Sequence, residues 1–119
     1  MKSIPILAVI TLLSAPPAIH ADTAGDGGHV LAAELVSDGS DQFGLLRGRV
    51  LIRQRVDEQT VEYVWGGNIC PGRDLADWQV QILFDLAATP YMLVVPQYRN
   101  GQGGSRCLVR WTAFNEKYD

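Results

Sequence analysis

The only cysteines in the chain, Cys70 and Cys107, constrain its fold more than any other feature. They enclose the stretch with the clearest helical pattern, and we expect them to form a disulfide that closes this stretch into a loop. The chain-entropy model assigns about 4 kcal/mol to closing a loop of this length. Because a chain this short buries only a modest core, such a cross-link would matter for its stability.

The first 21 residues have the layout of a secretory signal peptide. Lys2 supplies a positive charge, the run from Ile4 to Leu13 is apolar, and small residues and prolines follow as far as Ala21. The apolar run is too short to cross a bilayer as a helix, which takes about 20 residues. We therefore expect cleavage after Ala21, with Ala18 as the other possible site. The prolines argue against an uncleaved N-terminal helix.

An exported chain would reach an oxidising compartment, either the periplasm or the outside of the cell. Two cysteines in such a compartment usually form one disulfide. The alternative is two free thiols, one of them a nucleophile, but no histidine lies nearby in the sequence to activate a thiol. No second long apolar run and no lipid-anchor cysteine follows the signal, so we expect no membrane anchor.

The remaining chain has the composition of one globular domain. Residues 22–29 are acidic and glycine-rich and predict a disordered lead-in, residues 30–115 the domain, and residues 116–119 a tail. The formal net charge is −3, and removal of Lys2 with the signal would take it to about −4. A nucleic-acid partner calls for a basic footprint, so we expect none.

The segment from Leu45 to Val56 predicts the clearest strand, because its apolar and charged residues alternate. Its even positions are mostly apolar, and its odd positions include four arginines: Arg47, Arg49, Arg53 and Arg55. Val61 to Trp65 alternates in the same way and predicts the partner strand of a hairpin. A less regular strand is expected earlier, from Val30 to Val36.

The register of this hairpin can be predicted from its apolar faces. A four-residue loop, Asp57 to Thr60, pairs Val56 with Val61 and Ile52 with Trp65, so that the apolar faces match. A two-residue loop would also match them, but it needs positive φ at two positions, which suits Asn-Gly far better than Asp-Glu. We therefore predict the four-residue loop.

The second half of the chain predicts a helix between further strands. Asp74 is a good N-cap for a helix from Leu75 to Ala88, and Thr89-Pro90 would stop it. Helical spacing places Leu75, Trp78, Ile82 and Leu86 on the inward face of this helix. Trp65 and Trp111 also fall on predicted inward faces. Tyr91–Val95 predicts a covered strand, and Pro96, which lacks a donor, predicts that its end lies on an edge or at a bulge. Asn100–Gly104 predicts a turn, and Arg106–Phe114 the last strand.

The element order is strand, strand, strand, helix, strand, strand. It predicts an α+β fold, a small and mainly antiparallel sheet with one helix packed on it. The alternative is a five-stranded OB-like barrel, whose helix falls between the third and fourth strands. An OB closure pairs the third and fifth strands in parallel, which would separate Cys70 from Cys107 unless the loop from Gly66 to Arg73 doubles back. The expected disulfide therefore favours the open sheet.

The sequence offers no recognisable catalytic set. Within the expected mature chain, His29 is the only histidine, and the two cysteines are expected to be bonded. We therefore predict no catalytic residues, no metal site and no cofactor. Asp74 and Asp77 are best explained by capping of the predicted helix, although a hydrolase built on carboxylates alone remains open.

Two patches suit binding instead of catalysis. The arginine stripe on the first hairpin strand could meet an anionic partner, such as a carboxylate surface or an anionic glycan. The alternative is a solvated strand face that Glu62 and its neighbours partly neutralise. A second candidate patch, at the tip of the last hairpin, consists of Tyr98, Arg99 and Gln102. The alternative there is a plain turn.

These features predict a small exported binding module without catalysis, acting on a protein partner as an inhibitor or accessory factor. In element order and expected mature length, the chain resembles bacterial toxin B subunits, which are small secreted OB-fold proteins with a disulfide. That resemblance implies a glycan-binding subunit that works as a ring, although the cysteine placement departs from the pattern. A small carboxylate-dependent hydrolase is the third hypothesis, and the oligomeric state is open.

Overall fold

The computed structural model describes residues 22–116. The predicted signal peptide and the last three residues of the predicted tail lie outside this range. One α-helix, one short 3-10 helix and six strands make up the described chain: β1 (Thr23–Ala24), β2 (Gly28–Leu35), β3 (Gly48–Gln54), β4 (Thr60–Trp65), α1 (Asp77–Ala87), β5 (Met92–Asn100), η3 (Gln102–Gly104) and β6 (Arg106–Asn115).

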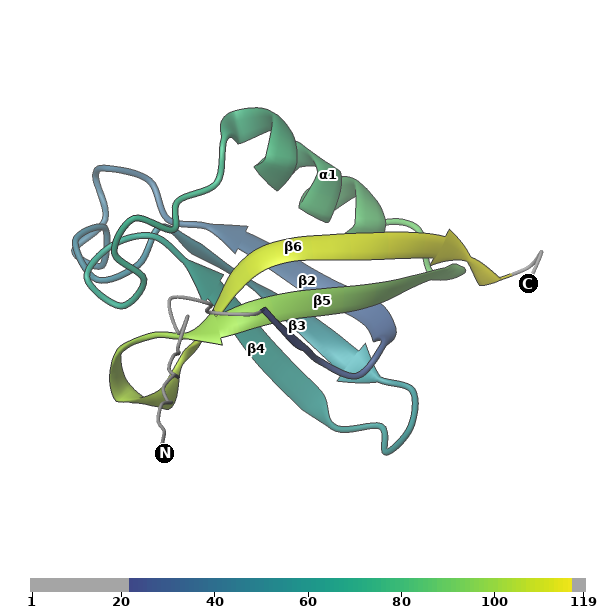
Figure 1. Ribbon diagram of the computed structural model, residues 1–119. Coiled ribbons are helices and arrows are strands. Elements are labelled where there is room, and N and C mark those ends of the chain that lie inside the picture. The colour runs from purple at the N-terminus through teal and green to yellow at the C-terminus, as the bar shows by residue number, and fades with distance from the viewer. Residues whose placement is uncertain (1–21, 117–119) are drawn as a thin grey trace, which may run out of the picture.

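The sheet closes on itself. Its strand order is β1-β5-β2-β3-β4-β6, and a further pairing between β5 and β6 joins five of the strands into a barrel. All pairings are antiparallel except that of β4 with β6, which is parallel and limited to Val64 and Cys107. Figure 1 shows α1 lying beside β6 over one side of the barrel. The arrangement fits the OB-like barrel, so the prediction of one helix with a mainly antiparallel sheet is partly correct.

The argument that favoured an open sheet was wrong because the loop from Gly66 to Arg73 does double back. Gly66 and Gly67 both have positive φ, and Gly66 forms an antiparallel bridge with Cys70. The chain therefore reverses directly after β4 and brings Cys70 back beside Cys107. The two cysteines form the expected disulfide, with 5.7 Å between their Cα atoms. A parallel pairing of β4 with β6 and this cross-link are thus compatible.

The β3–β4 hairpin has a four-residue loop, as expected, but in a different place. Ile52 pairs with Val61 instead of Trp65, and the loop comprises residues 55–58. Asp57 fixes this loop by accepting hydrogen bonds from the Gln54 side chain and the backbone N–H of Gln59, both at 3.0 Å. Both bonds lower the pKa of the Asp57 carboxyl, and the bond from the Gln54 side chain has the larger effect. The apolar faces still match because the two registers differ by an even number of residues.

Residues 22–29 contribute β1 and the start of β2 to the sheet and do not form the predicted disordered lead-in. Thr23 pairs with Tyr98 in β5, and the N–H of Gly25 donates to the Pro96 carbonyl at 2.9 Å. β2 then begins at Gly28, whose backbone lies so close to β3 that an added Cβ would meet the Arg53 carbonyl oxygen at 2.0 Å. The glycine-rich composition of this segment suggested disorder. In the structure, its glycines instead allow the backbone to approach the neighbouring strand closely.

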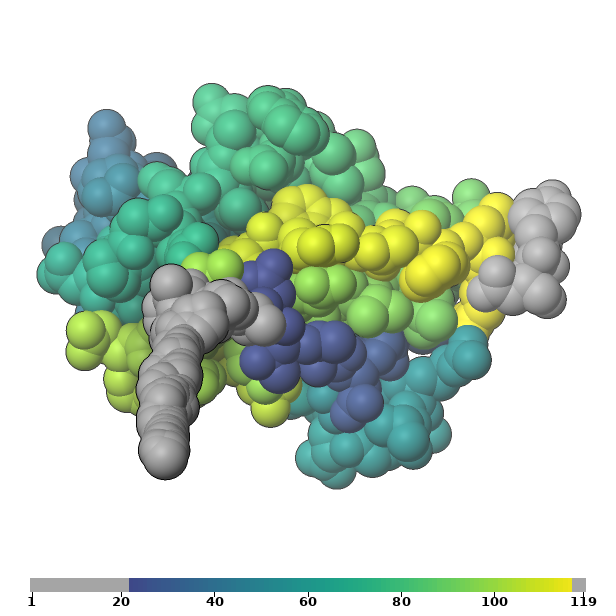
Figure 2. Space-filling model, viewed as in Figure 1, coloured from purple at the N-terminus to yellow at the C-terminus, as the bar shows by residue number. Residues whose placement is uncertain are grey.

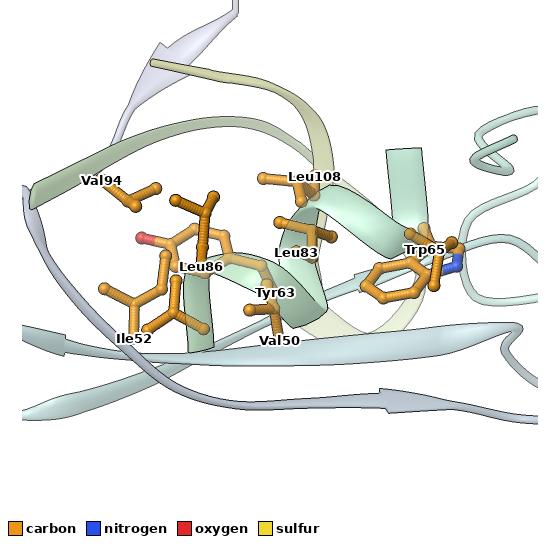
Figure 3. Close-up of a cluster of buried hydrophobic side chains, with 10 residues drawn as sticks. Val50, Ile52, Tyr63, Trp65, Leu83, Leu86, Val94 and Leu108 are labelled. Carbon is orange, nitrogen blue, oxygen red and sulfur yellow. The ribbon is translucent and has the colours of Figure 1, made fainter. Parts of the chain in front are cut away.

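The core fills the barrel beneath α1. Figure 3 shows side chains from β3, β4, β5, β6 and the helix converging, with Trp65 at one end of the cluster. The buried members are Val30, Val50, Ile52, Tyr63, Trp65, Val80, Leu83, Leu86, Val94 and Leu108. A second, smaller cluster surrounds the disulfide and contains Val36, Leu46, Val64, Cys70 and Cys107. The disulfide thus joins the loop after β4 to the start of β6, and a small apolar cluster separate from the main core surrounds it.

The helix begins at Asp77, later than the predicted Leu75, and Ala76 is its N-cap. The Gln79 side chain accepts a hydrogen bond from the Ala76 N–H at 2.8 Å, which closes the first turn. The Oδ1 of Asp74, the predicted cap, instead accepts from the N–H of Leu75 at 2.9 Å. The buried helix face consists of Val80, Leu83 and Leu86. Trp78 lies off that face, and the prediction that it belongs to the core was wrong.

The last strand contains a bulge that changes which residues point inward. Gln97 pairs with Arg110 and Tyr98 with Leu108, so Val109 is an extra residue in β6. Leu108 is consequently buried in the barrel, and Trp111 is only partly buried. Pro96 lies in the middle of β5, next to this bulge, and its carbonyl pairs with the N–H of Gly25.

Candidate binding site between α1 and β6

The predicted arginine stripe lies on the outer face of β3 and its flanks, and each arginine contacts a carboxylate. Arg49 is held between Glu34 at 2.6 Å and Glu62 at 2.7 Å. The other three ion pairs join Arg47 to Asp74 at 3.5 Å, Arg53 to Glu58 at 2.9 Å, and Arg55 to Glu116. The stripe is therefore a surface of mixed charge, and its role in binding stays a prediction.

The three residues of the second predicted patch have different surroundings, and their role in binding stays a prediction. Tyr98 lies 5.8 Å from the ring of Tyr63, and the Arg106 guanidinium sits 4.7 Å from the Tyr98 ring. The guanidinium of Arg99 donates to Asp22 at 2.9 Å. Gln102 is exposed at the start of η3. The ring of Tyr98 thus packs toward the core, whereas Arg99 faces the loop that carries the disulfide.

A cavity of about 420 Å³ lies beside the disulfide. Both cysteines line it, together with Thr23, Pro71, Arg73, Arg99, Asn100 and Gly101. Its size is in the range of small-ligand sites, and its two arginines make it suited to an anion. Arg99 is already paired with Asp22, whereas Arg73 has no carboxylate at ion-pair distance among the residues that the structure describes.

A groove between α1 and β6 has more of the features of a binding site. It consists of two adjoining hollows, of about 270 Å³ and about 150 Å³, that share Gln79 and Val109. Trp78, Ile82 and Trp111 line the larger hollow. The Trp78 side chain is 67% exposed, an unusual environment for the largest apolar residue. We call this surface the α1–β6 groove; Figure 2 shows α1 and the yellow β6 forming adjacent parts of one face.

An arginine lies on each part of the α1–β6 groove. Arg110 lines the larger hollow with the tryptophans, and Arg73 lines the smaller one with Leu75 and Leu108. Within residues 22–116, neither guanidinium has a carboxylate at ion-pair distance. Asp74 also borders the smaller hollow, but it is paired with Arg47. The groove is thus apolar in its larger part and carries two cations free to meet acidic groups.

The groove was missed in the sequence because the helix has two apolar stripes. The spacing of Trp78 and Ile82 suggested a core face, yet the core takes Val80, Leu83 and Leu86. A helix that is apolar on a second side indicates burial on both sides or a surface for a partner. The surplus of apolar residues on the helix was the one sequence feature that could have indicated the groove. The bulge in β6 that turns Trp111 toward α1 has no recognisable sequence pattern.

In the part of the chain that the structure describes, the remaining polar groups do not assemble a recognisable reaction centre. His29, predicted in the lead-in, lies on β2, where Nδ1 is 3.0 Å from the Met92 carbonyl oxygen and Nε2 is 3.2 Å from Glu116. Over residues 22–116, no group of three histidine, cysteine or acidic side chains is placed to hold a metal ion. In the same range, no helix has the length and apolar character needed to cross a membrane.

Comparison with known proteins adds no relative: no protein-family model, no curated protein and no solved structure matches this chain.

Proposed function

We propose that the protein is a small exported binding module without catalysis, which acts on a protein partner through the α1–β6 groove. The exposure of Trp78 within an apolar groove carries this proposal. Contiguous exposed apolar surface on a small domain marks interaction sites, and tryptophan and arginine are enriched among the residues that dominate binding energy. Trp78, Trp111 and Arg110 meet in the larger hollow of the groove.

The groove also combines an apolar centre with charged residues, as protein interfaces commonly do. Its centre is apolar, so covering it removes apolar surface from water at about 25 cal/mol per Å². Its arginines lie where a partner's carboxylates could pair with them, which orients the complex and speeds encounter. Arginines outside the groove that already have a carboxylate partner, such as Arg49 and Arg53, gain less from a new acidic group. Each of them would have to give up an existing ion pair.

Site-specific photocrosslinking tests the proposal in the cells that produce the protein. A photoreactive phenylalanine analogue at Trp78 should give a discrete adduct with one protein, identified by mass spectrometry. The same analogue at Val56 is the matched control, since that side chain is 75% exposed in the loop between β3 and β4, away from the groove. Adducts of the same mass from both positions, or none from Trp78, would contradict the proposal.

The barrel itself favours a second candidate, a glycan-binding subunit of the toxin-B type. OB-like barrels often bind oligosaccharides, although a fold alone does not assign a function. The cavity beside the disulfide, with Arg73 and Asn100 in its lining, is the place where an anionic glycan would bind. A glycan array probed with the wild type and with Arg73→Ala tests this candidate. Loss of a specific signal in the variant supports it, and an array without signal opposes it.

A further inference from the structure

Within residues 22–116, one edge of β6 has no neighbouring strand over most of its length. β5 covers the other edge from Arg106 to Asn115, whereas β4 meets β6 at Cys107 alone. From Leu108 to Phe114, the described chain therefore pairs no strand with the second edge. An open strand edge is a template for another chain, which proteins normally shorten, charge or cover.

The position of Pro96 shows which backbone groups of β6 point to that open edge. The Pro96 carbonyl accepts from Gly25 on the β1 side of β5, so it points away from β6. Pro96 pairs with Trp111, and in such an antiparallel pair both residues direct their N–H and C=O groups away from each other. The N–H and C=O of Trp111 therefore face the open edge.

The same alternation applies two residues further along. Ala113 pairs with Val94, whose other side pairs with Gly28 of β2. The N–H and C=O of Ala113 thus also point away from β5. None of the backbone or side-chain hydrogen bonds among residues 22–116 uses these groups of Trp111 or Ala113. Their spacing matches the bonds that one added strand would make.

The α1–β6 groove runs beside this edge, so main-chain and side-chain recognition coincide. An added strand uses backbone hydrogen bonds for affinity and pockets for alternate side chains for specificity. The hollow formed by Trp78, Ile82 and Trp111 suits an apolar side chain. Arg110 and Arg73, both without carboxylate partners in the described chain, suit acidic side chains.

We propose that an extended segment of the partner protein, combining apolar and acidic residues, adds as a strand to the open edge of β6. This inference rests on the proposed function and deepens it, since it specifies the conformation and chemistry of the partner segment. A helical partner would leave the backbone groups of Trp111 and Ala113 without hydrogen bonds.

The test starts from a library of random ten-residue peptides displayed on phage and selected against the purified, oxidised protein. Enriched peptides should alternate apolar and acidic residues, and synthetic copies should weaken in affinity with added salt, since screening reduces exposed charge pairs. Arg110→Glu should lower their affinity at least tenfold. Arg53→Glu is the matched control and should change it little, because that side chain lies on the outer face of β3.

Ala113→Pro tests the strand itself. Proline removes an N–H that β5 does not use, so the fold should tolerate it, whereas an added strand loses one hydrogen bond and meets the proline ring. We expect at least tenfold weaker peptide binding than with Ala113→Val, which keeps the N–H. Circular dichroism checks that both variants are folded, and an unfolded Ala113→Pro is replaced by a peptide N-methylated at alternate positions, which should bind at least tenfold more weakly.

Three results would overturn strand addition. The first is equal peptide affinity in Ala113→Pro and Ala113→Val, with N-methylation also harmless. The second is a selection that enriches no peptide. The third is a dimer of the purified protein that Ala113→Pro converts to monomer, because the edge would then be occupied by a second copy. A Trp78 adduct that persists in Ala113→Pro would show that the proposed function holds while this inference fails.

Discussion

Tyr63 shows how a single residue links the barrel core to its surface. Its side chain is fully buried, and its hydroxyl accepts a hydrogen bond from the Arg106 guanidinium at 3.3 Å. Burial raises the pKa of the Tyr63 phenol, and the bond to Arg106 opposes that rise only in part. The neutral phenol is therefore favoured more strongly in the folded protein than in the unfolded chain.

Tyr63→Phe should change how stability depends on pH at the alkaline end. Because the folded-state pKa is raised, the contribution of the phenol is complete below its unfolded value of about 10 and is lost as the pH rises through the folded value. The variant should be about 1 kcal/mol less stable at neutral pH, and this deficit should shrink above pH 10. Urea unfolding of both proteins from pH 7 to 11.5 measures it. A constant difference would contradict the assignment.

The backbone conformation of Gly67 allows the loop after β4 to reverse direction. Its φ is +67°, and an added Cβ would lie 2.5 Å from the backbone of Leu45. Gly72 has a similar φ of +75°, but its added Cβ would meet nothing. The two positions therefore separate the cost of the backbone conformation from the cost of a steric clash.

Gly67→Ala should destabilise the protein more than Gly72→Ala. A left-handed conformation costs a residue with a Cβ about 1–2 kcal/mol, which both variants incur. Only Gly67→Ala also forces Leu45 to move, so we expect at least about 1 kcal/mol more loss for it. Urea unfolding at neutral pH gives both values, and equal losses would show that the loop relaxes freely around position 67.

At the scale of elements, the disulfide holds together segments that hydrogen bonds join only weakly. β4 and β6 share a single pair, Val64 with Cys107, although both are needed to close the barrel. Cys70 and Cys107 are buried in the smaller cluster with Val36 and Leu46. The cross-link therefore acts at the closure point where strand pairing is shortest.

Replacing both cysteines by serine should cost about 2–4 kcal/mol of unfolding free energy. Part of the loss comes from the less constrained unfolded chain, and part from hydroxyls buried in an apolar cluster. Urea unfolding compares the double variant with the oxidised and the reduced wild type, and the reduced protein is the control for the serines. Unchanged stability in both would show that the barrel closes without the cross-link.

At the scale of the whole molecule, one edge of β6 has no neighbouring strand between Leu108 and Phe114 within the described chain, and the α1–β6 groove lies beside it. A ring of identical subunits, as in the toxin-B type of assembly, would bury such surfaces between copies. A binding module for another protein would keep them free. The solution mass therefore distinguishes the two candidate functions.

We expect a monomer when the oxidised protein is analysed by light scattering after gel filtration, because the α1–β6 groove is proposed for a different partner. A discrete ring-sized oligomer would contradict the expectation and favour the glycan-binding candidate. The measurement should be repeated at high salt, which weakens contacts between charged surfaces and leaves apolar ones in place. A mass that falls with salt would indicate nonspecific association.

Local patterns were enough to predict most elements. Alternation along residues 45–56 correctly separated the buried face of β3, with Val50 and Ile52, from its arginine face, because strand side chains alternate whatever the sheet becomes. Helical spacing found α1, although its first turn and buried side differed. Pairing of the two cysteines followed from their number and the expected compartment, and the structure confirms it. The predicted export and binding roles stay predictions.

Barrel closure, the doubled-back loop and the groove depended on contacts between segments far apart in the sequence. Two positive φ values at Gly66 and Gly67 allow a parallel strand pair and a disulfide together, and no local pattern specifies such a reversal. One extra residue in β6, Val109, shifts its inward face and places Trp111 beside α1. The sequence by itself determined which residues are apolar and how they alternate. Only the tertiary structure decided which apolar residues the core has room for, and that left Trp78 outside.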